Sequence, residues 1–388
     1  MTVAGAPGSP ARNGRLSVAL DVSAVPSSPA GAGRYIVELS RALARTDGVT
    51  LTLVARRDDR ARWEEVAPGC RVITPVPSSR PARLAFERSL LGPVVERLSG
   101  PAIDVYHGPH YTMPATLRVR RVVTVHDVTF LEHPEWHERS KVPFFKAAIR
   151  RAARRADVVV CVSSTTATRL GRLMEVSGEI VVAEHGVAHP RFCPGPVSGL
   201  PEGLDRHELV VHVGTLEPRK GVVDLVRAFD KLAGTRQELR LVLAGLAGWG
   251  ADEVEAAVAA SPHRARIDLL GFVPDETVVG LLRAASVVAY PSHDEGFGLP
   301  ALEAMATGAP LVTTKGTAME EFAGGVAFLT PPGDPVALAG ALERALEATA
   351  EERSRRREEG MRRAGGFTWE RTAEVHLEAY EKAASGRR

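Results

Sequence analysis

The sequence predicts an α/β protein with two doubly wound domains. Its 388 residues exceed what a single hydrophobic core usually serves. Short, fully apolar runs rich in β-branched residues alternate with Ala-, Leu- and Arg-rich helical stretches, and such strands form parallel sheets covered by helices on both faces. About six candidate strands fall in each half of the chain, which favours two such domains over one.

The candidate strands are spread evenly along the chain. In the first half they are Leu16–Val22, Thr50–Ala55, Arg71–Thr74, Val105–His107, Val122–His126, Val158–Val162 and Ile180–Val182, and in the second half Leu209–Val213, Leu239–Ala244, Arg266–Leu270, Val287–Tyr290, Leu311–Thr314 and Ala327–Leu329. Helical patterns between them include Gly33–Arg45, Val222–Ala233 and Ala251–Ala260. A last helix is predicted over Thr368–Ala383, with apolar positions at Trp369, Val375, Leu377 and Tyr380.

The domain boundaries follow from composition. The first 14 residues are small and polar with no apolar signal core, and they predict a disordered tail. The segment His189–Glu208 holds four prolines and three glycines without helical or strand periodicity, as a linker does. We therefore expect a first domain over 15–190, a linker over 191–208, a second domain over 209–366 and a C-terminal helix over 367–388.

Charge and cysteine content limit the classes of function that the chain can have. The chain carries 49 Lys and Arg against 47 Asp and Glu, which argues against a nucleic-acid partner. Residues 1–190 are nevertheless basic (26 basic, 18 acidic) and residues 191–388 acidic (23 basic, 29 acidic). Three scattered cysteines indicate reduced thiols, and no run reaches the roughly 18 apolar residues of a membrane span. We expect a cytoplasmic protein that at most touches the inner face of the cell membrane.

The segment Ser292–Pro310 carries the clearest chemistry. It follows the strand Val287–Tyr290, and ligands bind at the carboxyl ends of strands in such folds. Its glycines allow a tight turn into a short helix, whose first N–H groups near Leu299 can hold a phosphate. Glu295 and Glu303 flank this anion site, so we expect them to accept hydrogen bonds from sugar hydroxyls. The alternative is that they are a surface residue and a helix N-terminal charge.

Two further loops suit a phosphate. Arg219 and Lys220 follow the strand Leu209–Val213. The forked guanidinium of an arginine and the compact ammonium of a lysine together suit a diphosphate. The alternative is that both are solvated loop cations. The glycines around Gly33 follow the first strand and can admit an anion at a helix start. They do not form a dinucleotide fingerprint, and a plain glycine turn is the alternative there.

Several motifs together resemble a known family. They are VGTLEPRKG, GFVPDE, YPSHDEGFGLPALEAMATGAPLV and FTWE, joined by GAGRY, HGPHYTMP, VTVHDVTFLEHPE and GLAGWG. The chain resembles, from about residue 16 onward, the retaining, nucleotide-sugar-dependent glycosyltransferases of family four, and most of all bacterial mannosyltransferase-like members. The resemblance implies the GT-B architecture, in which two Rossmann-like domains face each other across a cleft and a C-terminal helix crosses back to the first domain.

The resemblance also implies site residues. Arg219 and Lys220 match the diphosphate-binding pair, Glu295 the residue that approaches the transferred sugar, and Glu303 the residue that binds the ribose. His126 matches a histidine that faces the donor sugar near the acceptor, although a structural histidine is the alternative. The remaining donor-binding positions are Gly33, Gly214, Phe272, Val273, Phe297, Gly298 and Leu299. Glu320 and the pair Gly324-Gly325 depart from the family pattern without touching the donor motif.

The acceptor side is less marked in the sequence. His107, His110, Tyr111 and Asp127 follow strand ends of the first domain, and we expect them to line the acceptor pocket. The basic segment Arg139–Arg155 holds seven cations and no acid, with Phe144, Phe145, Ala148 and Ile149 as its apolar face. It predicts either a helix on an anionic membrane, suited to a lipid-linked acceptor, or an ordinary surface helix.

The predicted reaction is transfer of a hexose, mannose by resemblance, from a nucleoside diphosphate sugar to a hydroxyl group of a sugar or lipid-linked acceptor with retention of configuration. Such a reaction would serve cell-surface polysaccharide or glycolipid synthesis. No metal signature or convincing carboxylate nucleophile accompanies the motifs, so we expect no cofactor, and a leaving phosphate that takes the acceptor's proton. A nucleotide-sugar epimerase, a phosphorylase and a non-catalytic sugar-nucleotide-binding subunit are the alternatives.

Overall fold

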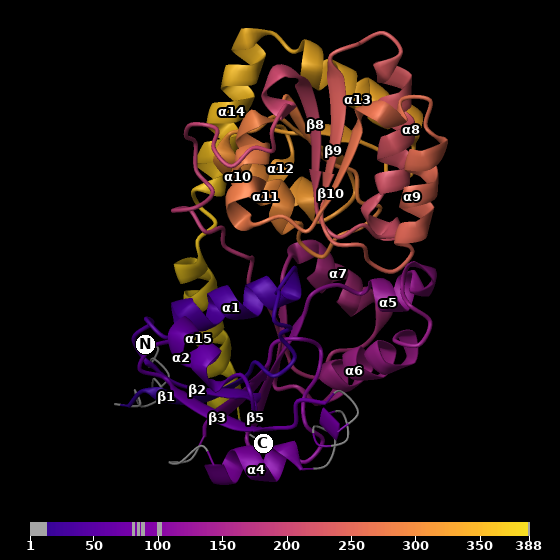
Figure 1. Cartoon of the computed structure of the whole chain (residues 1–388). Helices are drawn as coiled ribbons and strands as arrows, with labels where there is room; N and C mark the ends of the chain where they lie inside the picture. Colours follow the sequence, from indigo (N-terminus) through magenta and orange to yellow (C-terminus); the bar gives the residue numbers. More distant parts are fainter. Residues whose placement is uncertain (1–13, 80–81, 84–85, 87–89, 99–102, 387–388) are drawn as a thin grey trace, which may run out of the picture.

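The computed structural model describes residues 14–386, except 80–81, 84–85, 87–89 and 99–102. The predicted tail therefore lies, apart from residue 14, outside the described residues. The chain forms two lobes, each built on one parallel sheet (Figure 1). None of the helices in the described part of the chain is long and apolar enough to cross a membrane.

Every described strand pairs in parallel with its neighbours. The N-terminal sheet has the order β3-β2-β1-β4-β5-β6-β7 and the C-terminal sheet the order β10-β9-β8-β11-β12-β13. The strands are β1 (Leu16–Asp21), β2 (Val49–Arg56), β3 (Arg71–Val76), β4 (Val105–Gly108), β5 (Arg120–Val125), β6 (Val158–Cys161), β7 (Glu179–Val182), β8 (Glu208–Val213), β9 (Leu239–Ala244), β10 (Ile267–Gly271), β11 (Val287–Tyr290), β12 (Leu311–Thr314) and β13 (Phe328–Thr330). All thirteen predicted strands are confirmed, with ends shifted by one or two residues.

Helices connect these strands and cover the sheets. In the N-terminal lobe they are α1 (Ala32–Leu43), α2 (Arg60–Val66), α4 (Leu91–Leu98), α5 (Thr129–Glu132), α6 (Val142–Arg155) and α7 (Ser164–Leu173). In the C-terminal lobe they are α8 (Val222–Ala233), α9 (Ala251–Ala260), α10 (Asp275–Ala284), α11 (Leu299–Thr307), α12 (Met319–Ala323), α13 (Pro335–Glu347) and α14 (Ala350–Ala364). Between β7 and β8, the helical structure consists of one short 3-10 turn, Leu204–Arg206.

The order of the strands fixes where a ligand can bind. In each sheet the chain reverses its direction of travel across the sheet, between β1 and β4 in one and between β8 and β11 in the other. The loops that leave the strands diverge at such a point and open a crevice at the carboxyl edge. The loops at the carboxyl edges of the two sheets line one shared cavity.

The last helix, α15 (Trp369–Ser385), belongs to the lobe in which the chain began. It is drawn in yellow among the indigo and magenta elements of the N-terminal lobe (Figure 1). Thr368 caps it by accepting a hydrogen bond from the N–H of Arg371 at 3.1 Å. The His376 ring lies 2.8 Å from the Tyr35 hydroxyl of α1. The predicted return of the C-terminal helix to the first domain is therefore confirmed.

The buried face of α15 differs from the predicted one. Trp369, Ala373, His376 and Tyr380 are buried, whereas Val375 and Leu377 are only half-buried. A helix buries residues at spacings of three and four, and the series that starts at Trp369 passes through His376 rather than its apolar neighbours. The tyrosine and histidine are accommodated because each has a buried hydrogen-bond partner.

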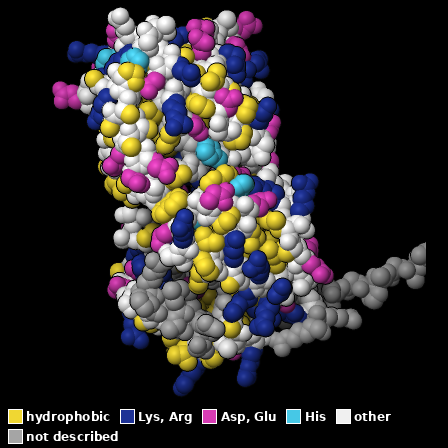
Figure 2. All heavy atoms as spheres, turned by 90° about the vertical axis from the view of Figure 1, so that its right-hand side faces the viewer, with side chains coloured by type: hydrophobic (Ala, Val, Ile, Leu, Met, Phe, Trp, Pro, Cys, Tyr) yellow, Lys and Arg dark blue, Asp and Glu magenta, His cyan; other side chains and the backbone are white. Residues whose placement is uncertain are grey.

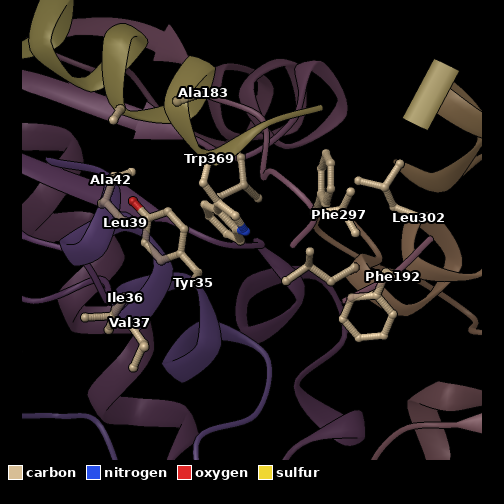
Figure 3. Packing of buried hydrophobic residues seen from close by; sticks show 14 of the residues in the cluster. Tyr35, Ile36, Val37, Leu39, Ala42, Ala183, Phe192, Phe297, Leu302 and Trp369 are labelled. Atoms are coloured by element: carbon tan, nitrogen blue, oxygen red, sulfur yellow. The ribbon is translucent and has the colours of Figure 1, made fainter. Parts of the chain in front are cut away.

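One apolar cluster joins the two lobes. Its members include Tyr35 of α1, Trp369 at the start of α15, and Phe297 and Leu302 around the start of α11. Figure 3 shows Tyr35 beside Trp369, with Phe297, Leu302 and Phe192 on the other side of the junction. This packing brings the glycine-rich turn before α11 close to the strand ends of the N-terminal sheet.

Candidate active site

A cavity of about 480 Å³ lies between the two sheets. Loops after β1, β4, β5, β6 and β7 line it from the N-terminal lobe, and loops after β8, β9, β10 and β11 line it from the C-terminal lobe. Of the sequence-predicted residues, it contains His110, Tyr111, His126, Asp127, Gly214, Arg219, Lys220, Phe272, Val273, Glu295, Phe297, Gly298, Leu299 and Glu303.

The backbones of the two lobes meet at Gly296. A Cβ atom on this residue would overlap the backbone carbonyl oxygen of His126 in the opposite lobe. The Gly296 carbonyl also accepts a hydrogen bond from the Thr166 hydroxyl of α7 at 3.3 Å. Glycine is required here because any side chain would push the two strand ends apart.

Glu295 is held between the two predicted diphosphate ligands. Its Oε2 lies 3.0 Å from Nη1 of Arg219, and its Oε1 contacts Nζ of Lys220. Ser292 donates a further hydrogen bond to Oε1 at 2.9 Å, and the Lys220 ammonium also donates to the Tyr290 hydroxyl at 2.8 Å. Burial alone would raise the pKa of Glu295, but Arg219 and Lys220 lower it to about 2. The carboxylate is therefore ionised, and it balances one of the two positive charges.

Local backbone geometry positions this group. Arg219 and Lys220 lie on a short 3-10 turn that ends at Gly221, which has a φ of 65°. A Cβ there would overlap the carbonyl oxygen of Pro291, so only glycine lets this turn pack against the loop after β11. The N–H of His293 in turn donates to the Arg219 carbonyl at 2.7 Å.

Helix α11 begins beside these charges. Its cap residue, Gly298, has a φ of 99°, and no side chain caps the helix. A Cβ at Gly298 would overlap the Met319 side chain. Leu299 and Pro300, in the first turn of the helix, line the cavity, so the partial positive charge of the helix terminus is available to an anion.

Glu303 of α11 is paired across the two lobes. Nη1 of Arg34, in α1, lies 2.9 Å from its Oε1, and Nη2 of Arg34 lies 2.6 Å from Oδ1 of Asp275. Burial raises the pKa of Glu303 to about 7, although Arg34 acts against this rise. The carboxyl group therefore changes its charge near neutral pH. Arg34 contacts only one of its two oxygens, Oε1, so a ligand can bind through the other.

His126 lies directly after β5 and lines the cavity. Its Nε2 is 2.8 Å from the carbonyl oxygen of Pro109. A carbonyl oxygen can only accept, so Nε2 carries the proton and Nδ1 of the neutral ring is left as an acceptor. Burial lowers the pKa of His126. The ring is therefore neutral at pH 7 and can accept, but not donate, through Nδ1.

Asp127 and Tyr111 sit beside His126. The Asp127 N–H donates to the Tyr111 hydroxyl at 3.1 Å, and its Oδ1 accepts from the Thr129 hydroxyl at 2.6 Å. Burial would raise the pKa of Asp127, but Arg219 and Thr129 lower it. Tyr111 has a φ of 61°, which is strained for a residue with a side chain and is found mainly where function requires it.

Two sequence predictions are corrected. His107 does not line the cavity: it is fully buried, with its ring nitrogens 2.8 Å from the hydroxyls of Tyr380 and Thr124. It lies within β4 rather than after it, so its side chain faces α15. Gly33 lies behind the cavity, where a Cβ would press on Pro29, and Gly31 and Ala32 form the lining instead.

Sequence reasoning missed several lining residues. Arg34 directly follows the glycine loop and belongs to the GAGRY motif, so this motif could have identified it as a site residue. His185 lines the cavity, and its buried Nδ1 has no hydrogen-bond partner among the described residues. No local pattern marks His185, because it is brought in by the loop after β7. Among the described residues no group of three or more His, Cys, Asp or Glu side chains could hold a metal ion.

Solved structures share this fold. HepE from Anabaena, solved with UDP-glucose, superimposes with a TM-score of 0.75 at 20% identity and covers 95% of this chain and 100% of that chain. Sucrose-phosphate synthase from Thermosynechococcus elongatus gives a TM-score of 0.75 at 22% identity, with coverage of 95% and 98%. The architecture is therefore that of the GT-B glycosyltransferases.

Sequence comparisons identify the family. Residues 29–191 match the family described as Glycosyltransferase Family 4, and residues 202–363 match Glycosyl transferases group 1. O-antigen chain mannosyltransferase B of Escherichia coli is 30% identical over 71% of this chain and 74% of its own length. A D-inositol 3-phosphate glycosyltransferase of Acidothermus cellulolyticus is 30% identical over 99% and 93%. The chain belongs to the group 1 glycosyltransferases of family four.

Gly296→Ala tests the contact between the lobes. The added methyl group must push His126 away from Glu295, and a displacement of about 1 Å at a reaction centre can reduce the rate about 100-fold. We expect a loss of this order in glycosyl transfer with an unchanged far-ultraviolet circular dichroism spectrum. Gly171→Ala, at an exposed position of α7 with open space around it, is the matched control. Full activity of Gly296→Ala would show that the lobes need not approach this closely.

The pKa of Glu303 predicts a pH dependence of nucleotide binding. An ionised carboxylate is the stronger acceptor for hydroxyl groups, so UDP or GDP should bind more tightly as the pH rises from about 6 to 8, with a midpoint near the pKa of about 7. Calorimetric titration of both nucleotides measures this step. Glu303→Gln does not titrate and reports the ligand's own ionisation. Equal steps in both proteins would assign the titration to another group.

Proposed function

We propose that this chain transfers a hexosyl group from a nucleoside diphosphate sugar to a hydroxyl group of an acceptor, with retention of configuration. The observation that carries this proposal is the ion-paired group of Arg219, Lys220 and Glu295 in the same cavity as the start of α11. Two cations with one anion leave a net positive charge beside a helix N-terminus, and this suits a diphosphate.

The leaving diphosphate sets the main energetic demand of such a reaction. Arg219, Lys220 and the N–H of Leu299, the first residue of α11, would stabilise the charge that develops as the glycosidic bond breaks. Because Glu295 already holds both cations in place, little rearrangement is needed when that charge appears. With these donors present, we expect the reaction to need no metal cofactor.

The other lining residues would bind the rest of the donor. Glu303 would accept hydrogen bonds from the ribose, and Phe272 and Val273 would lie against the base through backbone groups. Phe272 is 63% exposed, so a base could cover it. Phe297, Gly298 and Leu299, together with the loop containing Gly33, would contact the sugar and phosphates, and Nδ1 of His126 would accept from a sugar hydroxyl.

Retention requires either a carboxylate nucleophile or attack on the face that the leaving group departs from. Glu295 is engaged by two cations and Ser292, and Asp127 is engaged by Thr129. This engagement favours front-face attack, in which the acceptor oxygen bonds to the anomeric carbon as the phosphate leaves and takes the acceptor's proton. Asp127, His110 and Tyr111 would line the acceptor side.

Mannose is the donor sugar that the relatives suggest. Three of them are named mannosyltransferases: O-antigen chain mannosyltransferase B and the serotype-specific mannosyltransferase WbdA of Escherichia coli, and the MMP alpha-(1->4)-mannosyltransferase of Mycolicibacterium hassiacum. A role in cell-surface polysaccharide or glycolipid synthesis is proposed on the same ground. A nucleotide-sugar epimerase would instead return an altered donor without any acceptor, which product analysis distinguishes.

Lys220→Ala tests the donor site. It removes one diphosphate ligand but leaves Glu295 paired with Arg219, so the protein should fold. We expect turnover with nucleoside diphosphate hexoses to fall about 100- to 1000-fold, as for loss of one preorganised charge-stabilising donor. Lys231→Ala, at an exposed position of α8, the helix that follows Lys220, should leave turnover unchanged. Undiminished turnover in Lys220→Ala would remove the basis of the donor-site assignment.

Helix α6 carries a row of basic side chains on its surface. Lys146, Arg150 and Arg154 repeat at intervals of four residues, have no ion-pair partner among the described residues, and line a groove of about 500 Å³ that also contains Glu175. Figure 2, which faces the side that carries α6, shows Lys and Arg side chains gathered on the lower lobe. We propose that this surface contacts anionic lipid headgroups.

Vesicle sedimentation tests the α6 surface. Because each Lys or Arg near an anionic surface contributes about 1 kcal/mol, changing Lys146, Arg150 and Arg154 to Gln should weaken binding to phosphatidylglycerol vesicles by about 100-fold. The charge-matched control changes Arg353, Arg355 and Arg357 of α14 to Gln. Equal binding by both triple variants, or equal binding to neutral phosphatidylcholine vesicles, would contradict the proposal.

A further inference from the structure

We propose that a second cavity, beside α6, binds the hydrocarbon chain of a lipid-phosphate acceptor. This inference rests on the proposed glycosyl transfer and names the acceptor class. The cavity has a volume of about 390 Å³, within the range of small-molecule sites. Its lining residues are Asp21, Leu91, Tyr106, Tyr111, Thr112, Met113, Pro114, Phe144, Ala147, Ala148 and Arg151.

The character of this lining is apolar. Among the described lining residues, only Asp21, Thr112 and Arg151 contribute strongly polar side chains. The Asp21 carboxylate is already satisfied, because it accepts from the Tyr106 hydroxyl at 2.7 Å and from the Ser23 N–H at 3.0 Å. A sugar would find few free hydrogen-bond partners on this lining, whereas a hydrocarbon chain needs none.

Tyr111 lies between the second cavity and the donor cavity, since it lines both. Its ring lies 5.6 Å from that of His126, and its hydroxyl accepts from the Asp127 N–H. The strained backbone at φ 61° holds it in this dividing position. A ligand that occupied both cavities would have to pass around Tyr111, with its hydroxyl at His126 and its chain along the apolar cavity.

The side chains of helix α6 point in two directions, toward the sheet and toward the second cavity. Phe145 and Ile149 pack inward, against Phe130 and the sheet. Phe144, Ala147, Ala148 and Arg151 repeat at three- and four-residue intervals and face the apolar cavity. Phe144 is 42% exposed, so a ligand could cover its ring, and the two alanines leave room beside it.

Arg151 favours a ligand with a negative charge. It lines the apolar cavity and has no ion-pair partner among the described residues. Three other cations of α6, Lys146, Arg150 and Arg154, line the groove on the adjoining face of the same helix. An amphiphile with a phosphate beside its chain would place the chain over Phe144 and the phosphate near Arg151. A neutral amphiphile would gain only the apolar contact.

Binding of dodecyl phosphate, kept below its micelle concentration and followed by calorimetric titration, tests the proposal. We expect one saturable site per chain.

Ala147→Trp fills the cavity from an exposed position and should weaken binding at least tenfold. Phe144→Ser should weaken it several-fold, whereas Leu173→Ser, equally exposed at 42% but lining the basic groove, should not. Arg151→Gln should weaken binding of dodecyl phosphate and leave that of dodecyl maltoside unchanged.

UDP and GDP binding separates the two proposals. Each variant should bind these nucleotides like the unchanged protein, because none of the altered residues lines the donor cavity. Failure of the unchanged protein to bind either nucleotide would sink the donor site and leave the amphiphile result to stand alone. Absence of saturable dodecyl phosphate binding, undiminished binding by Ala147→Trp, or loss in Leu173→Ser would overturn the apolar acceptor site. If Ala147→Trp lowers the melting temperature, Phe144→Ser decides.

Discussion

The arrangement of the site depends on the close approach of Gly296 to the carbonyl oxygen of His126. The two lobes contribute different chemistry, cations and a helix terminus from one and a histidine and an aspartate from the other. Neither set can act on a shared substrate unless the strand ends come within a few ångströms of each other. A backbone without a side chain at this position makes that distance possible, and the apolar cluster around Phe297 and Trp369 maintains it.

Charge within the cavity is arranged locally rather than by the lobe as a whole. The C-terminal half of the chain is acidic in total, yet its anion site holds Arg219 and Lys220 buried beside a helix terminus. Glu295 keeps these cations from repelling each other while leaving a net positive charge. The acidic half thus attracts an anion only over short distances, where the screening by salt is weakest, and this favours ligands that fit the cavity.

Much of this organisation could be predicted from the sequence, and the failures have physical causes. Residues that follow a strand, such as Glu295, Arg219 and His126, were assigned to the cavity because the carboxyl edge of a parallel sheet collects its loops. The same reasoning was wrong for His107, which is the third of the four residues of β4. Neighbouring residues of a strand point to opposite faces of the sheet, so a position inside the strand does not share the direction of the residues that follow it. Arg34 and His185 depend on which loops meet across the lobes, and local periodicity carries no information about that.

The crossing of α15 has a consequence for how the chain is made. The buried pairs Tyr35–His376 and His107–Tyr380 join α1 and β4 of the N-terminal lobe to the last helix. On the ribosome, the N-terminal sheet must therefore wait, with the surface that α15 will cover still exposed, until the whole C-terminal sheet has been synthesised. The second lobe can complete its core before the first, so the order of synthesis and the order of maturation are opposite.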